Sequence, residues 1–251
     1  MGRTLLGIAY KGIYMKLINS YSEILTPING EQILKDIEKV ARTCYKSEDK
    51  ITKDDSSARD IVSKLLKRGH EAMLEFGDIT VKFVCDRGIS HEIVRHRVAS
   101  YAQESTRYCN YGKDEHMTFI IPSWMSYLEE GIWDEKRLRF YISHPNLGNC
   151  STINSNQGID VQNTTWLLTM ADAEHNYNKL IKTGWSPQQA RSILPNSLKT
   201  ELNVKMNIRE WRHFFKLRCS SAAHPQMQEL VRPLLKQFQN SIPILFDDIT
   251  Y

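Results

Sequence analysis

The segment "NIREWRHFFKLR" at residues 207–218 places an arginine on the face of a helix that its aromatic residues mark as buried. Trp211, Phe214, Phe215 and Arg218 recur at the i, i+3, i+4 and i+7 positions, which form one stripe of an α-helix. Arginine is almost never buried without a partner. Either the stem of Arg218 packs while its guanidinium reaches water past the helix end, or the guanidinium meets a buried anionic or polar ligand. The fold must provide one of these two surroundings.

A second basic segment, "RHRVASYAQESTRY", occupies residues 95–108. We expect a helix over 89–98 to carry Arg95, His96 and Arg97 near its C-terminal end. Neighbouring residues of a helix point about 100° apart, so these three side chains cannot form one solvated stripe. Either they surround a bound ligand, or they lie at a helix end where their charges face solvent or form salt bridges.

The same 207–218 segment carries a further pair of basic residues. Arg209 and His213 are four residues apart and therefore share a helix face. Two arginine-rich segments with aromatic neighbours favour a phosphorylated, aromatic small molecule as the ligand over plain surface charge.

The order of helical and strand-like segments indicates an α+β fold. Apolar periodicity and capping residues predict helices over 31–45, 56–70, 89–98, 164–184, 186–194, 207–219 and 225–238. Alternating apolar residues predict strands over 78–86, 117–121 and 198–206. These elements lack the regular strand–helix–strand alternation of a parallel α/β protein. The polar, Asn- and Ser-rich stretch 143–163 is expected to be an insertion loop within a single domain.

Composition excludes several classes of protein. A hydrophobic content of 41% is typical of a globular domain. The net charge of +4 is smaller than expected for a protein that coats nucleic acid. The five cysteines are odd in number and scattered, which argues against a disulfide framework and predicts a cytoplasmic location. No run approaches the roughly 20 apolar residues of a membrane span.

Metal and nucleotide motifs fail on their spacing. His91 and His96 are five residues apart, roughly 140° around a helix, so they cannot share a zinc ion from one face and no metal is predicted. No glycine pair forms the G-x-G of a dinucleotide fingerprint, and no P-loop lysine follows the N-terminal glycines. A nucleotide or flavin would therefore be held by side chains and helix ends.

Two other functions stay open from the residues alone. The basic segments could form an RNA or DNA surface, which predicts binding that weakens steeply with salt. A metal-dependent nucleotide phosphohydrolase would need clustered Asp and Glu ligands, and the sequence has no such cluster near the arginine segments. The visible spectrum of a bound flavin would separate a flavoprotein from both.

The "RHRVASYAQESTRY" segment resembles the signature of the flavin-dependent thymidylate synthases, the ThyX family. The resemblance continues, in family order, in "ARTCY", "GHEAMLEF", "ARSILP" and "NIREWRHFFKLR". It covers roughly residues 15 to 240, so residues 1–14 are expected to be a dispensable N-terminal extension of a domain that spans 15–251.

This resemblance implies a fold and a reaction. The fold is a central, mostly antiparallel sheet flanked by helices, in a homotetramer whose active sites lie between subunits. The reaction is the reductive methylation of dUMP to dTMP, a methyltransferase activity without an enzyme nucleophile. FAD is the cofactor, methylenetetrahydrofolate the one-carbon donor and NADPH the reductant; neither nucleic acid nor membrane is a partner.

The resemblance also assigns residues by position. It implies cofactor contacts from Arg95, His96, Arg97, Gln103, Asn207, Ile208, Arg209 and His213, with His70 beside the folate and the flavin. It implies substrate contacts from Glu92, Ile93, Val94, Arg95, Gln103, Glu104, Ser105, Thr106, Arg107, Arg191 and Arg218. Ser105 and Arg107 would come from a neighbouring subunit. Arg218 would be the catalytic residue, which polarises or ionises the N3 edge of the uracil.

The sequence departs from the family pattern at four positions. Ala72 stands where a small hydroxyl residue usually contacts FAD, and Ala102 replaces a usual Asn. Gln103 replaces a frequent acidic residue, and Phe76 a frequent His. Only backbone contacts with FAD are expected at 72 and 102, and no role is assigned to His224.

Overall fold

The computed structural model describes residues 14–54, 56–113, 116–125, 127–143 and 161–251. Nearly all of the expected N-terminal extension and most of the expected insertion loop lie outside the described residues. The chain divides into two compact units. The first unit comprises the described part of Met1–Asn19, Asp86–Gly88 and Glu104–Thr200, and the second comprises Ser20–Cys85, Ile89–Gln103 and Glu201–Tyr251.

The second unit is built on a four-stranded sheet with the order β2-β3-β7-β4. Its strands are β2 (Tyr21–Ile24), β3 (Asp78–Asp86), β7 (Lys199–Asn207) and β4 (Ala99–Gln103). The β2–β3 and β4–β7 pairs are antiparallel. The apolar residues that alternate along β3, from Ile79 to Cys85, are fully buried, as the sequence predicts for a strand with one face on the core.

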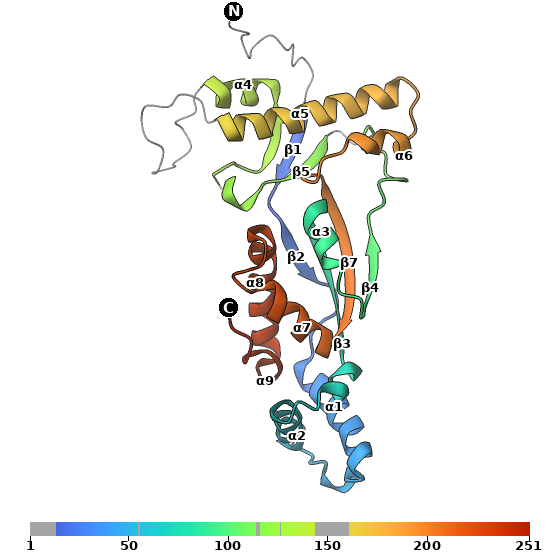
Figure 1. The fold of residues 1–251 in the computed structure, drawn as a ribbon. Coiled ribbons are helices and arrows are strands. Elements are labelled where there is room, and N and C mark those ends of the chain that lie inside the picture. Colours follow the sequence, from blue (N-terminus) through green and yellow to red (C-terminus); the bar gives the residue numbers. More distant parts are fainter. Residues whose placement is uncertain (1–13, 55, 114–115, 126, 144–160) are drawn as a thin grey trace, which may run out of the picture. The chain divides into compact units, whose positions relative to one another are not determined.

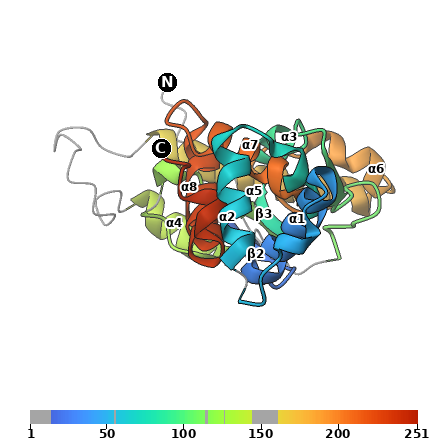
Figure 2. The ribbon, with the colours of Figure 1, turned by 90° about the horizontal axis from the view of Figure 1, so that it is seen from below.

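Helices complete this unit. They are α1 (Gly30–Tyr45), α2 (Ser56–Lys67), α3 (Arg87–Ile93), α7 (Ile208–Arg218), α8 (Pro225–Ser241) and α9 (Pro243–Phe246), with the 3₁₀ turns η1 (Glu48–Lys50) and η2 (Glu71–Phe76). The core is rich in aromatic rings from β3, α7, α8 and α9. Figures 1 and 2 both show α1 and α2 side by side.

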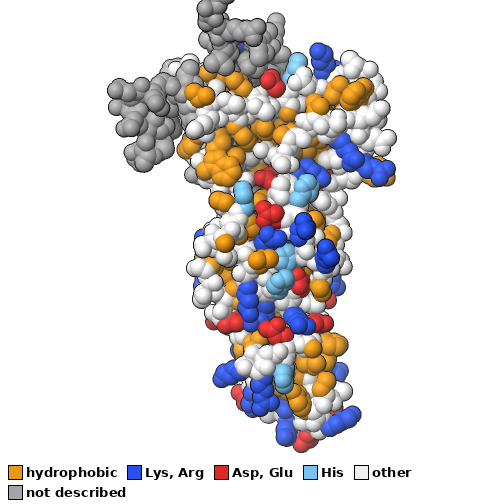
Figure 3. Space-filling model, viewed as in Figure 1, with side chains coloured by type: hydrophobic (Ala, Val, Ile, Leu, Met, Phe, Trp, Pro, Cys, Tyr) orange, Lys and Arg blue, Asp and Glu red, His pale blue; other side chains and the backbone are white. Residues whose placement is uncertain are grey.

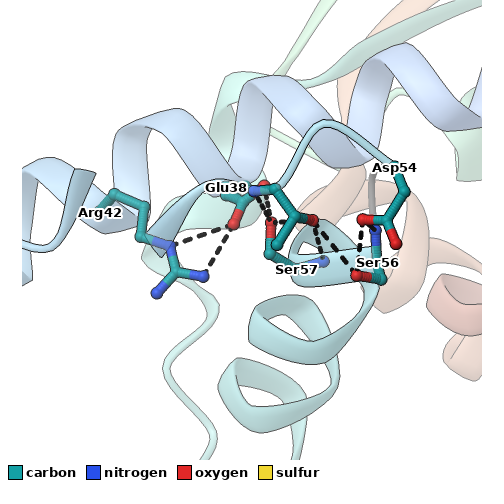
Figure 4. Close-up of polar contacts among 6 residues, drawn as sticks. Glu38, Arg42, Asp54, Ser56 and Ser57 are labelled. Atoms are coloured by element: carbon teal, nitrogen blue, oxygen red, sulfur yellow. Dashed lines mark hydrogen bonds and ion pairs between the residues drawn. The ribbon is translucent and has the colours of Figure 1, made fainter. Parts of the chain in front are cut away.

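A buried carboxylate joins α1 to α2 (Figure 4). Glu38 is 3% exposed and accepts two hydrogen bonds from Arg42, four residues along the same helix. Its other oxygen accepts from the Ser57 hydroxyl of α2, 3.1 Å away. The hydroxyls of Ser57 and Thr52 in turn accept each other's backbone N–H groups. Because a buried charge needs partners, this network fixes how the two helices meet.

A second ion pair holds the C-terminal segment against α7. Arg212 is 3% exposed and donates to both carboxylate oxygens of Asp248 at 2.7 Å, and to the Leu245 carbonyl. The hydrogen bonds from Arg212 hold the pKa of Asp248 below its usual range, with a smaller electrostatic contribution from Lys216. A depressed carboxyl pKa stabilises the fold only while the group is ionised.

We therefore expect Asp248→Asn to destabilise the protein at pH 7 by an amount that shrinks as the pH falls. The contribution of Asp248 is fully present above its unfolded pKa of about 3.9 and is lost as the pH falls through its lower folded value. Urea unfolding of the wild type and Asp248→Asn at neutral and acidic pH measures this difference. A difference that stays constant over that range would show that charge pairing is not what Asp248 contributes.

The first unit holds a three-stranded sheet with the order β5-β1-β6. β1 (Tyr14–Ile18) runs parallel to β5 (Met117–Ile120) and antiparallel to β6 (Gly131–Asp134). The long helix α5 (Val161–Lys182) packs on β1. The remaining elements are η3 (Ser123–Met125), α4 (Glu135–Ser143), α6 (Pro187–Ala190) and η5 (Arg191–Ile193).

Ser186 and Gln189 form a capping box at the start of α6. The backbone N–H of Ser186 donates to the Gln189 side chain at 2.9 Å, and Pro187 occupies the first helical position. This box starts the short helix that delivers Arg191.

The predicted α+β class is confirmed, with helices packed on mostly antiparallel strands. The strands form two sheets, one in each unit, where the sequence suggested one central sheet. The expected domain limits stay a prediction. Among the described residues, no helix is long and apolar enough to cross a membrane.

Candidate functional site

The three basic residues 95–97 lie in a turn, so the predicted helix over 89–98 is wrong at its end. α3 stops at Ile93, where its last backbone bonds change to the tighter i−3 pattern: Arg95 N–H donates to the Glu92 carbonyl and His96 N–H to the Ile93 carbonyl. The Tyr101 hydroxyl, from β4, donates to the His96 carbonyl. The turn leaves Arg95 and Arg97 exposed and points His96 into the unit, where it is 3% exposed.

His96 lies between a carboxylate and an arginine, both from α7. Its Nδ1 atom is 2.8 Å from Glu210 Oε1, and its Nε2 atom accepts a hydrogen bond of 3.2 Å from Arg218 Nε. The ring also packs edge-on against Phe214, with the centroids 4.9 Å apart. Burial lowers the pKa of His96 and outweighs the hydrogen bond to Glu210, which acts in the opposite direction; the Arg218 charge lowers it further. His96 is therefore a neutral ring at neutral pH.

The structure argues against the first of the two surroundings that the sequence position of Arg218 suggested, in which the guanidinium reaches water. Its guanidinium does not reach past the helix end into water, because the side chain is only 14% exposed. Instead it donates to Glu92 Oε2 and to the Glu92 carbonyl, both at 2.8 Å, and to His96. Its charge is thus compensated inside the second unit, and its position is fixed by the three hydrogen bonds that it donates to two residues.

The start of α7 presents a second group of polar side chains. Asn207 caps the helix, and its Oδ1 atom accepts the Glu210 N–H at 2.8 Å. Arg209 and His213 are exposed on the same face, as predicted. Arg209 pairs with Glu75 at 2.7 Å and lies 3.8 Å from Glu71. The side chain of Ile208 is buried, so only its backbone can meet a ligand.

Two cavities of the second unit adjoin these residues. The larger, of about 560 Å³, is lined by Glu71, Glu75, Val98, Asn207, Arg209, Glu210, Arg212, His213 and Lys216. The other, of about 370 Å³, is lined by Cys44, Tyr45, Leu65, Gly69, His70, Glu71, Ala72, Met73 and Arg209. Glu71 and Arg209 belong to both. Figure 3 shows basic and histidine side chains interleaved with acidic ones over α3 and α7.

His70 lies in the smaller cavity, where the Tyr45 hydroxyl is 3.2 Å from its Nδ1 atom. Ala72 lines the same cavity, so the absence of a hydroxyl there changes its wall. Gln103 lies at the end of β4 and donates to Ser90 Oγ at 3.0 Å. Ile93 is buried and Val94 half-buried within the second unit.

The remaining predicted substrate residues belong to the first unit and form their own group. Arg191 donates to the Thr106 hydroxyl at 3.3 Å. Glu104 accepts from the Tyr111 hydroxyl at 2.8 Å and pairs with Lys199 at 3.0 Å. Burial raises the pKa of Tyr111, so its hydroxyl keeps the proton it donates.

Ser105 and Arg107 lie in the turn beside this group. Ser105 Oγ accepts the Arg107 N–H at 3.3 Å, and the Arg107 guanidinium lies 5.5 Å from the centre of the Tyr108 ring. Arg107 and Tyr108 are exposed, whereas Ser105 is half-buried.

His96, Glu210 and His213 come close enough to hold a metal ion, with ligand atoms within 4.8 Å of one another. Their hydrogen bonds argue against it. Arginine is only a donor, so Arg218 requires the Nε2 lone pair of His96, and the proton lies on Nδ1. A metal at Nδ1 would move that proton to Nε2, against the Arg218 N–H. The cluster is better explained as a hydrogen-bonded chain.

Sequence reasoning did not single out several residues of this site. Glu210 joins His96 to His213, Glu71 and Glu75 neutralise Arg209, and Tyr45 contacts His70. Glu210 was detectable in part, because it is the third residue after the cap Asn207 and precedes His213 by three. Its contact with His96 joins residues 114 positions apart, which no local pattern reports.

Residues 29–244 match the family model described as Thy1, thymidylate synthase complementing protein. The chain belongs to this family. A flavin-dependent thymidylate synthase of Geobacter sulfurreducens is 29% identical to this Thy1 family member over 215 residues, which are 83% of this chain and 78% of that protein. Another, of Pyrococcus abyssi, is 30% identical over 191 residues, which are 75% of this chain and 65% of that protein.

The fold of this Thy1 family member is also found among solved structures. A UMP/dUMP methylase PolB from Streptomyces cacaoi, solved with 5-Br dUMP, is similar with a TM-score of 0.69 and 20% identity. The match covers 93% of this chain and 96% of the other. The predicted ThyX-type fold is therefore confirmed.

Proposed function

We propose that this chain is a flavin-dependent thymidylate synthase that methylates dUMP to dTMP. Methylenetetrahydrofolate is the one-carbon donor, and FAD reduced by NADPH is the hydride source. Membership of the Thy1 family and the names of its relatives support this function. The observation that carries it is that two distant family segments meet in one hydrogen-bonded chain, in which Arg218 donates to Glu92 and His96.

The residues at the start of α7 fit the polar part of a flavin nucleotide. Arg209, His213 and Lys216 line the larger cavity and offer N–H donors of the kind that bind phosphate. Glu71 and Glu75 balance the charge of Arg209, so a phosphate competes with two carboxylates for one guanidinium. When bound and reduced, the flavin supplies the hydride for the reaction.

The full flavin site of this proposal comprises the turn after α3, the end of β4 and the start of α7. Its members are Arg95, His96, Arg97, Gln103, Asn207, Ile208, Arg209 and His213, with His70 at the side of the folate. Arg95 and Arg97 contribute exposed cations, and Ile208 contributes its backbone because its side chain is buried.

The substrate is assigned to the residues around Arg218. A planar guanidinium can face two atoms on the edge of a uracil, and it stabilises negative charge that develops there. Glu92, Ile93, Val94, Glu104, Thr106 and Arg191 contribute further contacts to dUMP. Ser105 and Arg107 serve the site of a neighbouring subunit, and the active form is the homotetramer that the family resemblance implies.

The cytoplasm is the proposed location, since the odd number and the scatter of the cysteines suit a reducing compartment. The mild net charge of +4 supports a small anionic substrate and no nucleic-acid partner.

The proposal is tested by spectroscopy and by product analysis on the full chain. We expect the purified protein, after incubation with FAD, to show the visible spectrum of a bound flavin. We also expect it to form dTMP from dUMP only when methylenetetrahydrofolate and NADPH are both present.

Two outcomes would reject this function in favour of another. A colourless protein that binds RNA or DNA with steep salt dependence would identify a nucleic-acid-binding module. A colourless protein that releases phosphate from nucleotides with a divalent metal would identify a phosphohydrolase.

A further inference from the structure

Glu210 contacts both His96 and His213 of this network. It lies in the first turn of α7 and is 9% exposed. Its Oε1 atom is 2.8 Å from His96 Nδ1 and 3.3 Å from His213 Nδ1. His96 is buried, whereas the side chain of His213 is 63% exposed and lines the larger cavity. The short contact is therefore to the ring that is enclosed by protein.

The hydrogen bonds around His96 determine which ring nitrogen carries its proton. The guanidinium of Arg218 has only N–H donors, so the 3.2 Å contact from Arg218 Nε requires a lone pair on His96 Nε2. The proton of the neutral ring is then on Nδ1, where Glu210 Oε1 accepts it. The other tautomer would put an N–H against the N–H of Arg218 and a lone pair against the Glu210 carboxylate.

We propose that Glu210 is a positioning residue, which holds His96 in the tautomer that accepts from Arg218 and so fixes the guanidinium. The assignment of a catalytic task to Arg218 rests on the function proposed above, whereas the link from Glu210 to Arg218 rests on the geometry alone. Carboxylates that orient a histidine in this way fix its tautomer and the direction of its ring.

The groups facing His96 come from three elements. α7 contributes Glu210, His213, Arg218 and the Phe214 ring, and the Tyr101 hydroxyl of β4 donates to the His96 carbonyl. From α3, Glu92 holds the far side of the Arg218 guanidinium through two further bonds. Those two bonds engage the two terminal nitrogens of the guanidinium and leave Nε to donate to His96. The third hydrogen bond, from Arg218 Nε to His96 Nε2, depends on the His96 tautomer and therefore on Glu210.

The tautomer is tested directly by NMR, without substrate. We expect ¹⁵N-histidine-labelled wild-type protein to show a neutral His96 with its proton on Nδ1, assigned by comparison with His96→Asn. In Glu210→Ala the Nδ1–H loses its acceptor, so we expect the Nε2–H form to gain population at the expense of the bond from Arg218 Nε. Glu210→Gln keeps the size of the side chain and an oxygen acceptor, so it should retain the Nδ1–H form and serves as the variant that folds if alanine does not. An unchanged tautomer in Glu210→Ala would overturn the proposal.

The consequence for Arg218 is tested by a double-mutant cycle, scored as dTMP formed per bound flavin. We expect Glu210→Ala to lower this rate by about 10- to 100-fold, the scale found when an orienting partner is removed. In the Arg218→Ala background, Glu210→Ala should lower the rate no further, because the effects of mutating residues that act as one unit are not additive. Equal losses in both backgrounds would show that Glu210 acts independently of Arg218.

Glu135→Gln is the control, since it removes a carboxylate that accepts a side-chain hydrogen bond elsewhere, from Arg139 in an i,i+4 pair on α4. It should leave the His96 tautomer and the rate unchanged. If the wild type forms no dTMP, the proposed function fails, but the NMR comparison still decides whether Glu210 sets the tautomer.

Discussion

Replacing Arg218 with alanine is expected to leave flavin bound and to lower dTMP formation per flavin by about 10²-fold or more. That is the scale measured when one preorganised donor is removed from a developing charge. Arg218 is held by Glu92 and His96, and its guanidinium is largely enclosed, so it is fixed before a substrate arrives. Preorganisation of this kind is what an electrostatic role in the proposed reaction requires.

The matched comparison is Arg209→Ala on the same helix. Arg209 is 51% exposed and lies in both cavities assigned to the cofactor side, so its loss should reduce flavin content first. Flavin absorbance and dTMP per flavin, measured for both variants, separate the two roles. Equal loss of flavin in both would assign Arg218 to the fold or the cofactor, and unchanged turnover per flavin in Arg218→Ala would reject the mechanism.

Arg218→Lys refines this comparison. A lysine keeps the positive charge but offers a point charge in place of a planar fork, and it cannot make the three separate contacts of the guanidinium. We therefore expect only partial recovery of the rate. Thermal unfolding of each variant accompanies the assay, because Arg218→Ala also leaves Glu92 and His96 without their shared partner.

The sequence predicts those parts of the fold that local patterns determine. β3 is predictable because its apolar residues alternate over a full strand, and α7 because its aromatic stripe repeats at helical spacing between the cap Asn207 and Arg218. The end of α3 is not, because its last turn tightens and the Tyr101 hydroxyl, from the following strand, donates to the His96 carbonyl. Such an end depends on tertiary contacts.

The same distinction applies to the site. The position of Arg218 on an apolar stripe showed that its surroundings must be unusual, and the pattern could not say that protein groups would supply them. Glu92 and His96 come from a segment more than 120 residues away, at separations of 126 and 122 positions. Glu210 reaches His96 across 114 positions. Spacing rules describe neighbours along a helix, whereas this network is created by the packing of α7 beside α3.

Trp211→Ala is expected to give the largest loss of stability, because α7 depends on its aromatic stripe for its position. Trp211 is fully buried, with Phe215 and Phe238 rings 5.6 Å and 5.3 Å from it, and its indole N–H donates to the Ile79 carbonyl at 3.0 Å. Truncation of a buried tryptophan costs about 3–5 kcal/mol, as lost burial plus the cavity left behind. Trp211→Phe should cost less, since it keeps most of the volume and loses the hydrogen bond.

Trp185→Ala is the control for this change. Trp185 is 45% exposed, and substitutions at such positions usually alter stability by within about 0.5 kcal/mol. Denaturant unfolding followed by far-UV circular dichroism measures both variants. Trp211 is the one tryptophan of the second unit, and the other four of the chain belong to the first. In Trp211→Ala the remaining tryptophan fluorescence therefore reports the first unit separately. An unchanged circular dichroism midpoint in Trp211→Ala would mean that the aromatic stripe does not anchor α7. A lowered midpoint would show that this stripe stabilises the helix carrying Asn207, Glu210 and Arg218, so the residues proposed to bind flavin and substrate would depend on its packing.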